Sequence, residues 1–103
     1  MAKPPKIRAG RFATPLDGDA VAADWRARGF SCHEFNDPPG QAWNDFVHDS
    51  DELVTVVRGR LELIVEAERF VVEAGDEAFI PRGARHSVRN LAPGPTRWLF
   101  GYG

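Results

Sequence analysis

The middle of the chain alternates between apolar and polar residues with the period of a β-strand. Leu61, Leu63 and Val65 alternate with charged side chains, which is typical of a strand that buries one face. A mostly β-branched run at 53–57 precedes them, and an Arg-Gly-Arg turn centred on Gly59 separates the two segments. We therefore predict two consecutive strands joined by a tight turn.

Further short strands are predicted toward the C-terminus, because brief apolar runs there are separated by glycine, proline and asparagine. These runs occupy 69–74, 77–81, 86–90 and 97–102. No stretch of residues 30–103 has the periodicity of a helix of useful length. Short, regularly spaced strands without crossover helices indicate an all-β fold, either an antiparallel β-sandwich or a small barrel.

The N-terminal part of the chain has a different pattern. Residues 17–28 offer acidic candidates for a helix cap and then alanines, and Gly29 follows as a stop signal, so we predict one short helix. Residues 1–14 are locally basic and show no sustained periodicity, so we expect an irregular, solvated arm. A length of 103 residues suits a single domain over 1–103, with its core barrel at about 30–103.

Composition and charge are those of an ordinary globular protein, with 43% apolar and 27% charged residues. A formal net charge of −2 gives no electrostatic reason to expect nucleic acid or an anionic membrane as a partner. The single cysteine, Cys32, excludes an intramolecular disulfide and fits a reducing compartment. No segment resembles a signal peptide or reaches membrane-spanning length, so we expect a cytoplasmic protein.

The segment HDSDELVTVVRG at 48–59 places His48 four positions before Glu52. Side chains at even separations share one face of an extended chain, so Phe46, His48 and Glu52 would face inward with Val54 unless a bulge intervenes. An interior carboxylate needs a compensating charge or full hydrogen bonding, and a metal held together with a neutral imidazole supplies that charge. The alternative is a surface loop in which the histidine and the acidic side chains are solvated.

The spacing of several residues resembles the two motifs of the cupin superfamily, G-x5-H-x-H-x3-4-E-x6-G and G-x5-P-x4-H-x3-N. The second motif is matched throughout, and the first is matched apart from its first histidine. The matching residues are Gly40, His48, Glu52 and Gly59 in the first motif and Gly75, Pro81, His86 and Asn90 in the second. The resemblance implies an antiparallel jelly-roll β-sandwich or barrel in which His48, Glu52 and His86 converge.

The resemblance also implies a metal site, but the usual set of three histidines and one glutamate is incomplete. Phe46 occupies the position of the first motif histidine, which leaves His48, Glu52 and His86. Two histidines and one carboxylate form a facial triad that suits Fe(II), while Mn, Ni and Zn also accept these ligands. We expect one divalent ion. The alternatives are a structural cluster in which Phe46 fills a vacated pocket, or a replacement ligand from His33.

Aromatic residues near the motifs are candidates for the walls of a small-molecule pocket, because such pockets are generally lined by apolar side chains. These candidates are Trp43, Phe46, Phe79, Trp98 and Phe100, each of which could instead belong to the core. Four arginines cluster around the second motif, where one could bind a substrate carboxylate or all could be solvated: Arg82, Arg85, Arg89 and Arg97. We expect Cys32 to behave as a small buried apolar residue, not as a nucleophile.

Together these features predict a small metal-binding cupin that acts on a small organic molecule, as a dioxygenase or an isomerase with a 2-His-1-carboxylate site. A non-catalytic module that binds or senses a small molecule is the alternative, and a structural dimer with a vestigial metal site is another. We expect a homodimer, since a small sandwich has sheet edges to protect. The segments before Phe30 and at 97–103 are the candidate contacts. The sequence identifies neither the substrate nor the metal.

Overall fold

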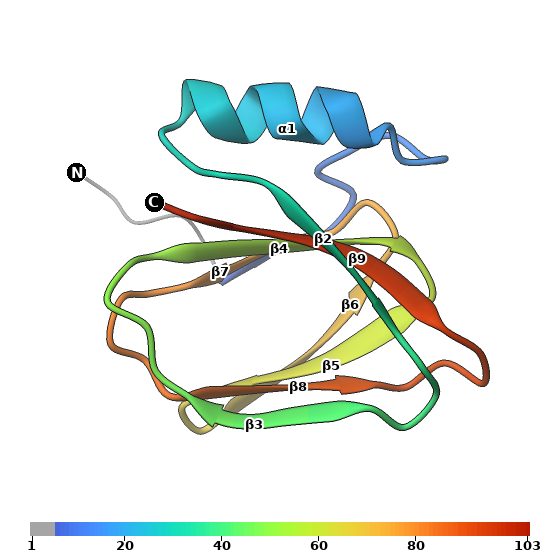
Figure 1. The fold of residues 1–103 in the computed structure, drawn as a ribbon, viewed down its shortest axis with the longest axis vertical. Coiled ribbons are helices and arrows are strands. Elements are labelled where there is room, and N and C mark those ends of the chain that lie inside the picture. The colour runs from blue at the N-terminus through green and yellow to red at the C-terminus, as the bar shows by residue number, and fades with distance from the viewer. Residues whose placement is uncertain (1–5) are drawn as a thin grey trace.

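The computed structural model describes residues 6–103 and shows two β-sheets facing one another, with one helix on the outside (Figure 1). The predicted all-β antiparallel fold is confirmed, because every pairing between the strands is antiparallel. The elements in chain order are β1 (Ile7–Arg8), α1 (Gly18–Ala27), β2 (His33–Asp37), β3 (Ala42–Phe46), β4 (Glu52–Arg58), β5 (Arg60–Val65), β6 (Glu68–Glu73), β7 (Glu77–Ile80), β8 (His86–Asn90) and β9 (Thr96–Tyr102).

The two sheets bury two separate apolar clusters. One sheet has the strand order β1-β7-β4-β9-β2, and the other has the order β3-β8-β5-β6. The larger cluster fills the space between the sheets and includes Val54, Val56 and Leu63. A second cluster, which includes Leu53, lies between the five-stranded sheet and α1. Strand β4 is therefore apolar on both faces, which explains its nearly continuous run of hydrophobic residues.

Helix α1 confirms the short helix predicted from the sequence, and polar contacts attach it to the sheet. The carboxylate of Asp17 caps its first turn by accepting hydrogen bonds from backbone N–H groups. Near the other end, Trp25 Nε1 donates to the buried Glu77 at 2.9 Å, and both terminal nitrogens of Arg28 donate to the same carboxylate at 2.8 and 3.1 Å. Gly29 follows with a positive φ of 88°, which ends the helix.

The N-terminal arm is more ordered than predicted over its described residues. Strand β1 pairs with β7, with Ile7 opposite Ala78, and the N–H of Phe12 donates to the carbonyl of Gly75 at 2.9 Å. The arm is therefore not wholly irregular: β1 pairs with β7, which would otherwise end the sheet with an open edge, while the remaining described residues of the arm form turns, bends and coil. Residues 1–5 of the expected arm lie outside the described residues.

One of the two candidate segments for a dimer contact belongs to an interior strand. Strand β9 lies between β4 and β2, so its backbone is paired on both sides. Its residue Leu99 packs in the apolar cluster under α1. The segment at 97–103 therefore offers no free strand edge to a second copy. Within residues 6–103, no helix is both long and apolar enough to span a membrane.

Candidate metal centre

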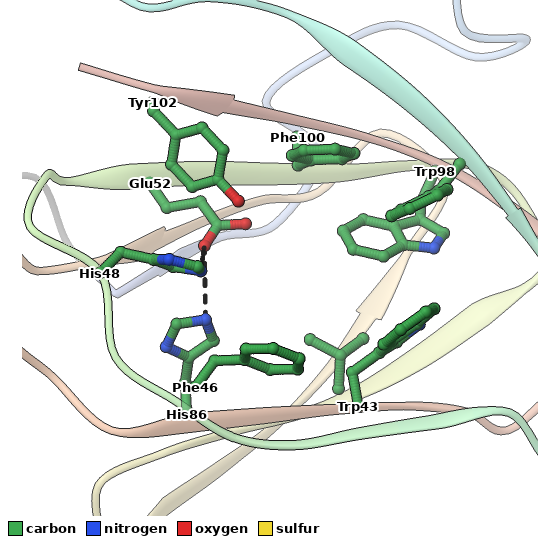
Figure 2. Close-up of a pocket in the computed structure, with 10 residues that line it drawn as sticks. Trp43, Phe46, His48, Glu52, His86, Trp98, Phe100 and Tyr102 are labelled. Carbon is green, nitrogen blue, oxygen red and sulfur yellow. Dashed lines mark ion pairs between the residues drawn. The ribbon is translucent and has the colours of Figure 1, made fainter.

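Two strands and one loop bring His48, Glu52 and His86 to a common point between the two sheets (Figure 2). Glu52 begins β4 in the five-stranded sheet, and His86 begins β8 in the four-stranded sheet. His48 lies in the loop between β3 and β4, where its carbonyl accepts a hydrogen bond from the N–H of Gly83 at 3.0 Å. Residues from both sheets and from a connecting loop thus face one another.

The two distances from Glu52 to the imidazoles are close to those between ligands of a single ion. Oε1 of Glu52 lies 3.4 Å from Nε2 of His86 and 3.5 Å from Nε2 of His48. All three potential ligand atoms lie within 4.8 Å of one another. Two ligands that each bind one ion at about 2.1 Å are separated by roughly 3.0 to 3.4 Å in tetrahedral or octahedral geometry.

The ion-pair partners of Glu52 are the imidazoles of His48 and His86, which carry a positive charge only when protonated. The residue is only 3% exposed, and its Oε1 has no hydrogen-bond partner of adequate geometry. A buried carboxylate oxygen without a partner is costly, and a divalent cation between it and the two imidazoles would compensate the charge. The donor set and its surroundings therefore fit a divalent metal.

The ring of His86 is held in the orientation that coordination requires. Its Nδ1 lies 3.1 Å from the carbonyl oxygen of Ala84, which only accepts hydrogen bonds, so Nδ1 carries a proton. In the neutral ring, Nε2 then presents its lone pair to Glu52, an arrangement common among metal-binding histidines. Burial lowers the pKa of His86, but the contacts with Glu52 and with the Ala84 carbonyl outweigh it and raise the pKa overall.

A cavity of about 200 Å³ adjoins the three residues, and aromatic rings form most of its wall. The predicted wall residues Trp43, Phe46, Trp98 and Phe100 all line it. The complete lining consists of Phe35, Trp43, Phe46, His48, Glu52, His86, Val88, Trp98, Phe100 and Tyr102. Phe46 lies beside the two histidines, with its ring centroid 6.1 Å from that of His48 and 6.3 Å from that of His86.

Phe79 is the predicted pocket residue that the structure places elsewhere. It pairs with Leu53 across β7 and β4, and both side chains pack in the cluster under α1, with Trp25. Side chains alternate between the faces of a strand, so Phe79 faces the helix while its neighbours Ala78 and Ile80 face the space between the sheets. Its assignment to the pocket is wrong for this reason.

Tyr102 and Phe35 line the cavity but were not among the predicted residues. Tyr102 follows Trp98 and Phe100 at even positions of β9, so the alternation along that strand could have identified it. Its ring stands edge-on to His48, with centroids 5.0 Å apart. Burial and the negative charge of Glu52 raise the pKa of Tyr102, which keeps its hydroxyl protonated as a donor beside the cluster.

The remaining candidates lie away from the cluster. His33 is exposed on β2, with its ring centroid 5.3 Å from that of Phe100, and it does not join the three metal-site residues. Cys32 is partly buried, and burial raises the pKa of its thiol, which disfavours the reactive thiolate. None of the four arginines lines the cavity. Arg82 contacts the backbone at Asp49, while Arg85, Arg89 and Arg97 pair with Asp45, Glu62 and Glu34.

Comparison with known proteins gives the family. The sequence model of the cupin domain family matches residues 33–102. The chain therefore belongs to the cupin domain family. The chain is 31% identical over 99 residues to "Polyketide synthase CurC" of Streptomyces cyaneus, covering 95% of this chain and 62% of that protein. It is 36% identical over 89 residues to quercetin 2,3-dioxygenase of Bacillus subtilis strain 168, covering 81% of this chain and 26% of the enzyme. The chain thus spans less than two thirds of either relative.

Solved structures show the same cupin jelly roll. The protein TT1209 of Thermus thermophilus superposes with a TM-score of 0.65 at 29% identity, over 71% of each chain. Oxalate oxidase in complex with the substrate analogue glycolate gives a TM-score of 0.65 at 23% identity, over 73% of this chain and 42% of that one. The second likeness concerns the fold alone. The predicted jelly roll and the resemblance to cupins are both confirmed.

Proposed function

We propose that this protein is a metal-binding cupin that acts on a small organic molecule held in its cavity. His48, Glu52 and His86 hold one divalent ion in this proposal. The observation that carries it is the buried Oε1 of Glu52, which has no hydrogen-bond partner and lies 3.4 and 3.5 Å from two imidazole nitrogens. The chemistry of the ligands admits Fe, Mn, Ni or Zn.

Each residue of the site has a distinct role in this proposal. A bound ion would supply Lewis acidity toward an oxygen atom of the ligand. Glu52 neutralises part of the ion's charge, and the Ala84 carbonyl fixes the ring of His86. Tyr102 offers a hydroxyl donor to the same oxygen, and aromatic rings line the space around it. The reaction class we propose is oxygenative cleavage or isomerisation, and the likeness to a dioxygenase supports the former.

A second candidate is a non-catalytic module that binds or senses a small molecule. The observation in its favour is Phe46, which stands where the motif has a third histidine. A structural dimer with a vestigial site is a third candidate, and it predicts neither metal nor ligand binding. These candidates differ in whether the protein retains a metal and whether it turns over a substrate.

The test is the metal content of the purified protein, offered Fe(II), Mn, Ni and Zn in turn and passed through gel filtration. We expect one ion per chain, and we expect Glu52→Gln to lose most of it, because the amide keeps the shape but lacks the charge. Glu62→Gln is the matched control, since Glu62 is also buried on a strand but pairs with Arg89 at 3.2 Å, away from the cavity. If the wild-type protein retains none of the four metals, the metal-dependent function is wrong and the binding module replaces it.

A further inference from the structure

The cavity has two chemically distinct ends. We define the polar end as His48, Glu52, His86 and Tyr102, and the aromatic end as Phe35, Trp43, Trp98 and Phe100. Figure 2 shows the polar side chains gathered at one end and the two tryptophans with Phe100 toward the other. A ligand that fills the cavity therefore meets polar groups at one end and ring carbons at the other.

A buried carboxylate fixes the aromatic end. Oδ2 of Asp37 accepts hydrogen bonds from Nε1 of Trp43 and from Nε1 of Trp98, each at 3.1 Å. Trp43 lies on β3 of one sheet and Trp98 on β9 of the other, so this oxygen joins the two sheets. Asp37 itself is 2% exposed and does not line the cavity. Both indole N–H groups are thus satisfied outside the cavity, and the rings offer it no hydrogen-bond donor.

The rings at this end form a continuous aromatic wall. Phe35 stacks on Trp43 with centroids 5.7 Å apart and on Phe100 with centroids 5.3 Å apart. Trp98 lies 5.2 Å from Phe100 in a tilted arrangement. Because aromatic rings attract one another in stacked and tilted arrangements, such a wall favours a flat ring over a saturated body of equal size.

The volume limits the size of the ligand. An engineered apolar cavity of about 150 Å³ binds benzene, which has six heavy atoms. By proportion, the cavity of about 200 Å³ holds about eight heavy atoms, which is one ring with one or two substituent atoms. Phe35 and Phe46 in the cavity wall are 44% and 38% exposed, so the cavity is open to solvent beside them and would not enclose a molecule with two or three fused rings.

We propose that the cavity is a binding site for a single aromatic ring that carries one oxygen group, with the oxygen at the polar end. This inference rests on the metal site proposed above, because a divalent ion beside one carboxylate leaves a net positive charge that attracts a phenol or phenolate oxygen. The ring lies against the aromatic end, where Asp37 holds both indole N–H groups away from the cavity.

The test compares three compounds with one hydroxyl group each, two phenols and one alcohol, and the metal-free protein separates recognition of the ring from the acidity of the hydroxyl group. Phenol, cyclohexanol and 2-naphthol are titrated by calorimetry into zinc-loaded and metal-free protein. We expect phenol to bind zinc-loaded protein about tenfold more tightly than either of the others, a ratio equivalent to roughly 1.4 kcal/mol. Equal binding of cyclohexanol would refute recognition of the ring, and equal binding of 2-naphthol would refute the size limit.

The indole N–H signals locate the ligand, because the chain has three tryptophans. Phenol should shift the nuclear magnetic resonance signals of Trp43 and Trp98 and leave that of Trp25, which is buried under α1, unchanged. Shifts confined to other residues would overturn the proposal. If the protein retains no zinc but metal-free protein still prefers phenol, the metal function fails and the aromatic site survives. If zinc binds but phenol is not preferred, the proposed metal function survives and the aromatic site is refuted.

A cavity-filling variant supplies an independent test. Val88 is 4% exposed and lines the cavity, so Val88→Phe should abolish phenol binding while zinc binding is retained. Phe79→Leu is the control, because it removes an aromatic ring that lies outside the cavity. If Val88→Phe does not fold, Trp43→Leu replaces it, with the same loss of phenol binding expected. Unchanged phenol affinity in a folded variant would overturn the proposal.

Discussion

Phe46 determines whether a fourth ligand could reach the candidate metal centre. The residue ends β3 directly opposite His86, after a β-bulge that begins at Trp43 and includes Asp45 with a positive φ of 59°. The bulge turns the Phe46 side chain toward the cluster, where it is 38% exposed at the edge of the cavity. Position 46 is therefore near the cluster, although its present side chain cannot coordinate a metal.

The first prediction is that Phe46→His tightens zinc binding. A histidine at this position would add a fourth nitrogen ligand beside His48 and His86, and we expect the affinity to rise about tenfold, the scale on which changes around a metal site act. Competition with a chromophoric chelator measures the change. Phe35→His is the control, because Phe35 lines the aromatic end, and it should leave the affinity unchanged. Unchanged or weaker zinc binding by Phe46→His would contradict the geometry.

For individual residues, the motif spacing predicted which side chains meet at the candidate metal centre. The alternation of side chains along the strands could not place every aromatic ring. His48, Glu52 and His86 were identified from their separations, and the structure brings them together. Phe79 was misplaced because both faces of β7 are buried, so apolar character does not distinguish the face under α1 from the cavity face. Only the packing of α1 over one face separates the two faces, and Trp25, which donates to Glu77, belongs to that packing.

Helix α1 is attached to the five-stranded sheet by an ion-pair network as well as by apolar packing. Asp24 accepts from Arg11 at 2.8 Å and from Arg28 at 2.9 Å, and Arg28 continues to the buried Glu77. Burial raises the pKa of Asp24, but its hydrogen bonds to Arg28 and Arg11 prevail and hold that pKa below its usual value of 3.8. The folded state thus favours the ionised carboxylate.

The second prediction concerns the stability of this attachment against pH. Folding lowers the pKa of Asp24. Its contribution to the free energy of unfolding is therefore present above the unfolded pKa, and it is lost as the pH falls through the folded pKa. At pH 7, Asp24→Asn should lower the free energy of unfolding by about 0.5 to 1 kcal/mol. The two proteins should converge as the pH falls below the folded pKa of Asp24. Urea unfolding midpoints across this range measure the difference, and a constant difference at all pH values would contradict the assignment.

The elements after residue 30 were largely predictable because their turns need particular residues. Gly59 has a positive φ of 105°, and a Cβ there would lie 2.2 Å from Oγ1 of Thr96, so the turn between β4 and β5 requires glycine. The two N–H groups of the Asn90 amide are shared among three backbone carbonyl oxygens, those of Asp37, Pro38 and Gly94, and so tie β8 to two turns. Strand β1 was not predicted, because two residues, Ile7–Arg8, are too few to show a period.

The outermost strands of both sheets are paired on one side only. In the described part of the chain, β1 and β2 end one sheet, and β3 and β6 end the other. The third prediction is a homodimer that covers some of these edges. Sedimentation at micromolar concentration should give twice the 11.4 kDa mass of the chain. A monomer at concentrations well above micromolar would count decisively against it. Such a contact would involve an edge strand or the segment before Phe30, since β9 is interior.

The last prediction concerns the coupling of metal binding to the stability of the sandwich. Glu52 belongs to the five-stranded sheet and His86 to the four-stranded sheet, so an ion bound by both links the two layers. The unfolded chain does not hold these residues together, and binding should therefore stabilise the folded state by mass action.

At a free zinc concentration of 100 times the dissociation constant, we expect a gain of about 2.7 kcal/mol in the free energy of unfolding. Thermal unfolding followed by circular dichroism, with and without zinc, measures it. Glu52→Gln should lose most of the gain, because the amide cannot neutralise the ion. Glu62→Gln should keep it, since Glu62 pairs with Arg69 and Arg89 away from the cavity. An equal gain in both variants would mean that zinc binds elsewhere on the protein, and the assignment of His48, Glu52 and His86 as its ligands would be wrong.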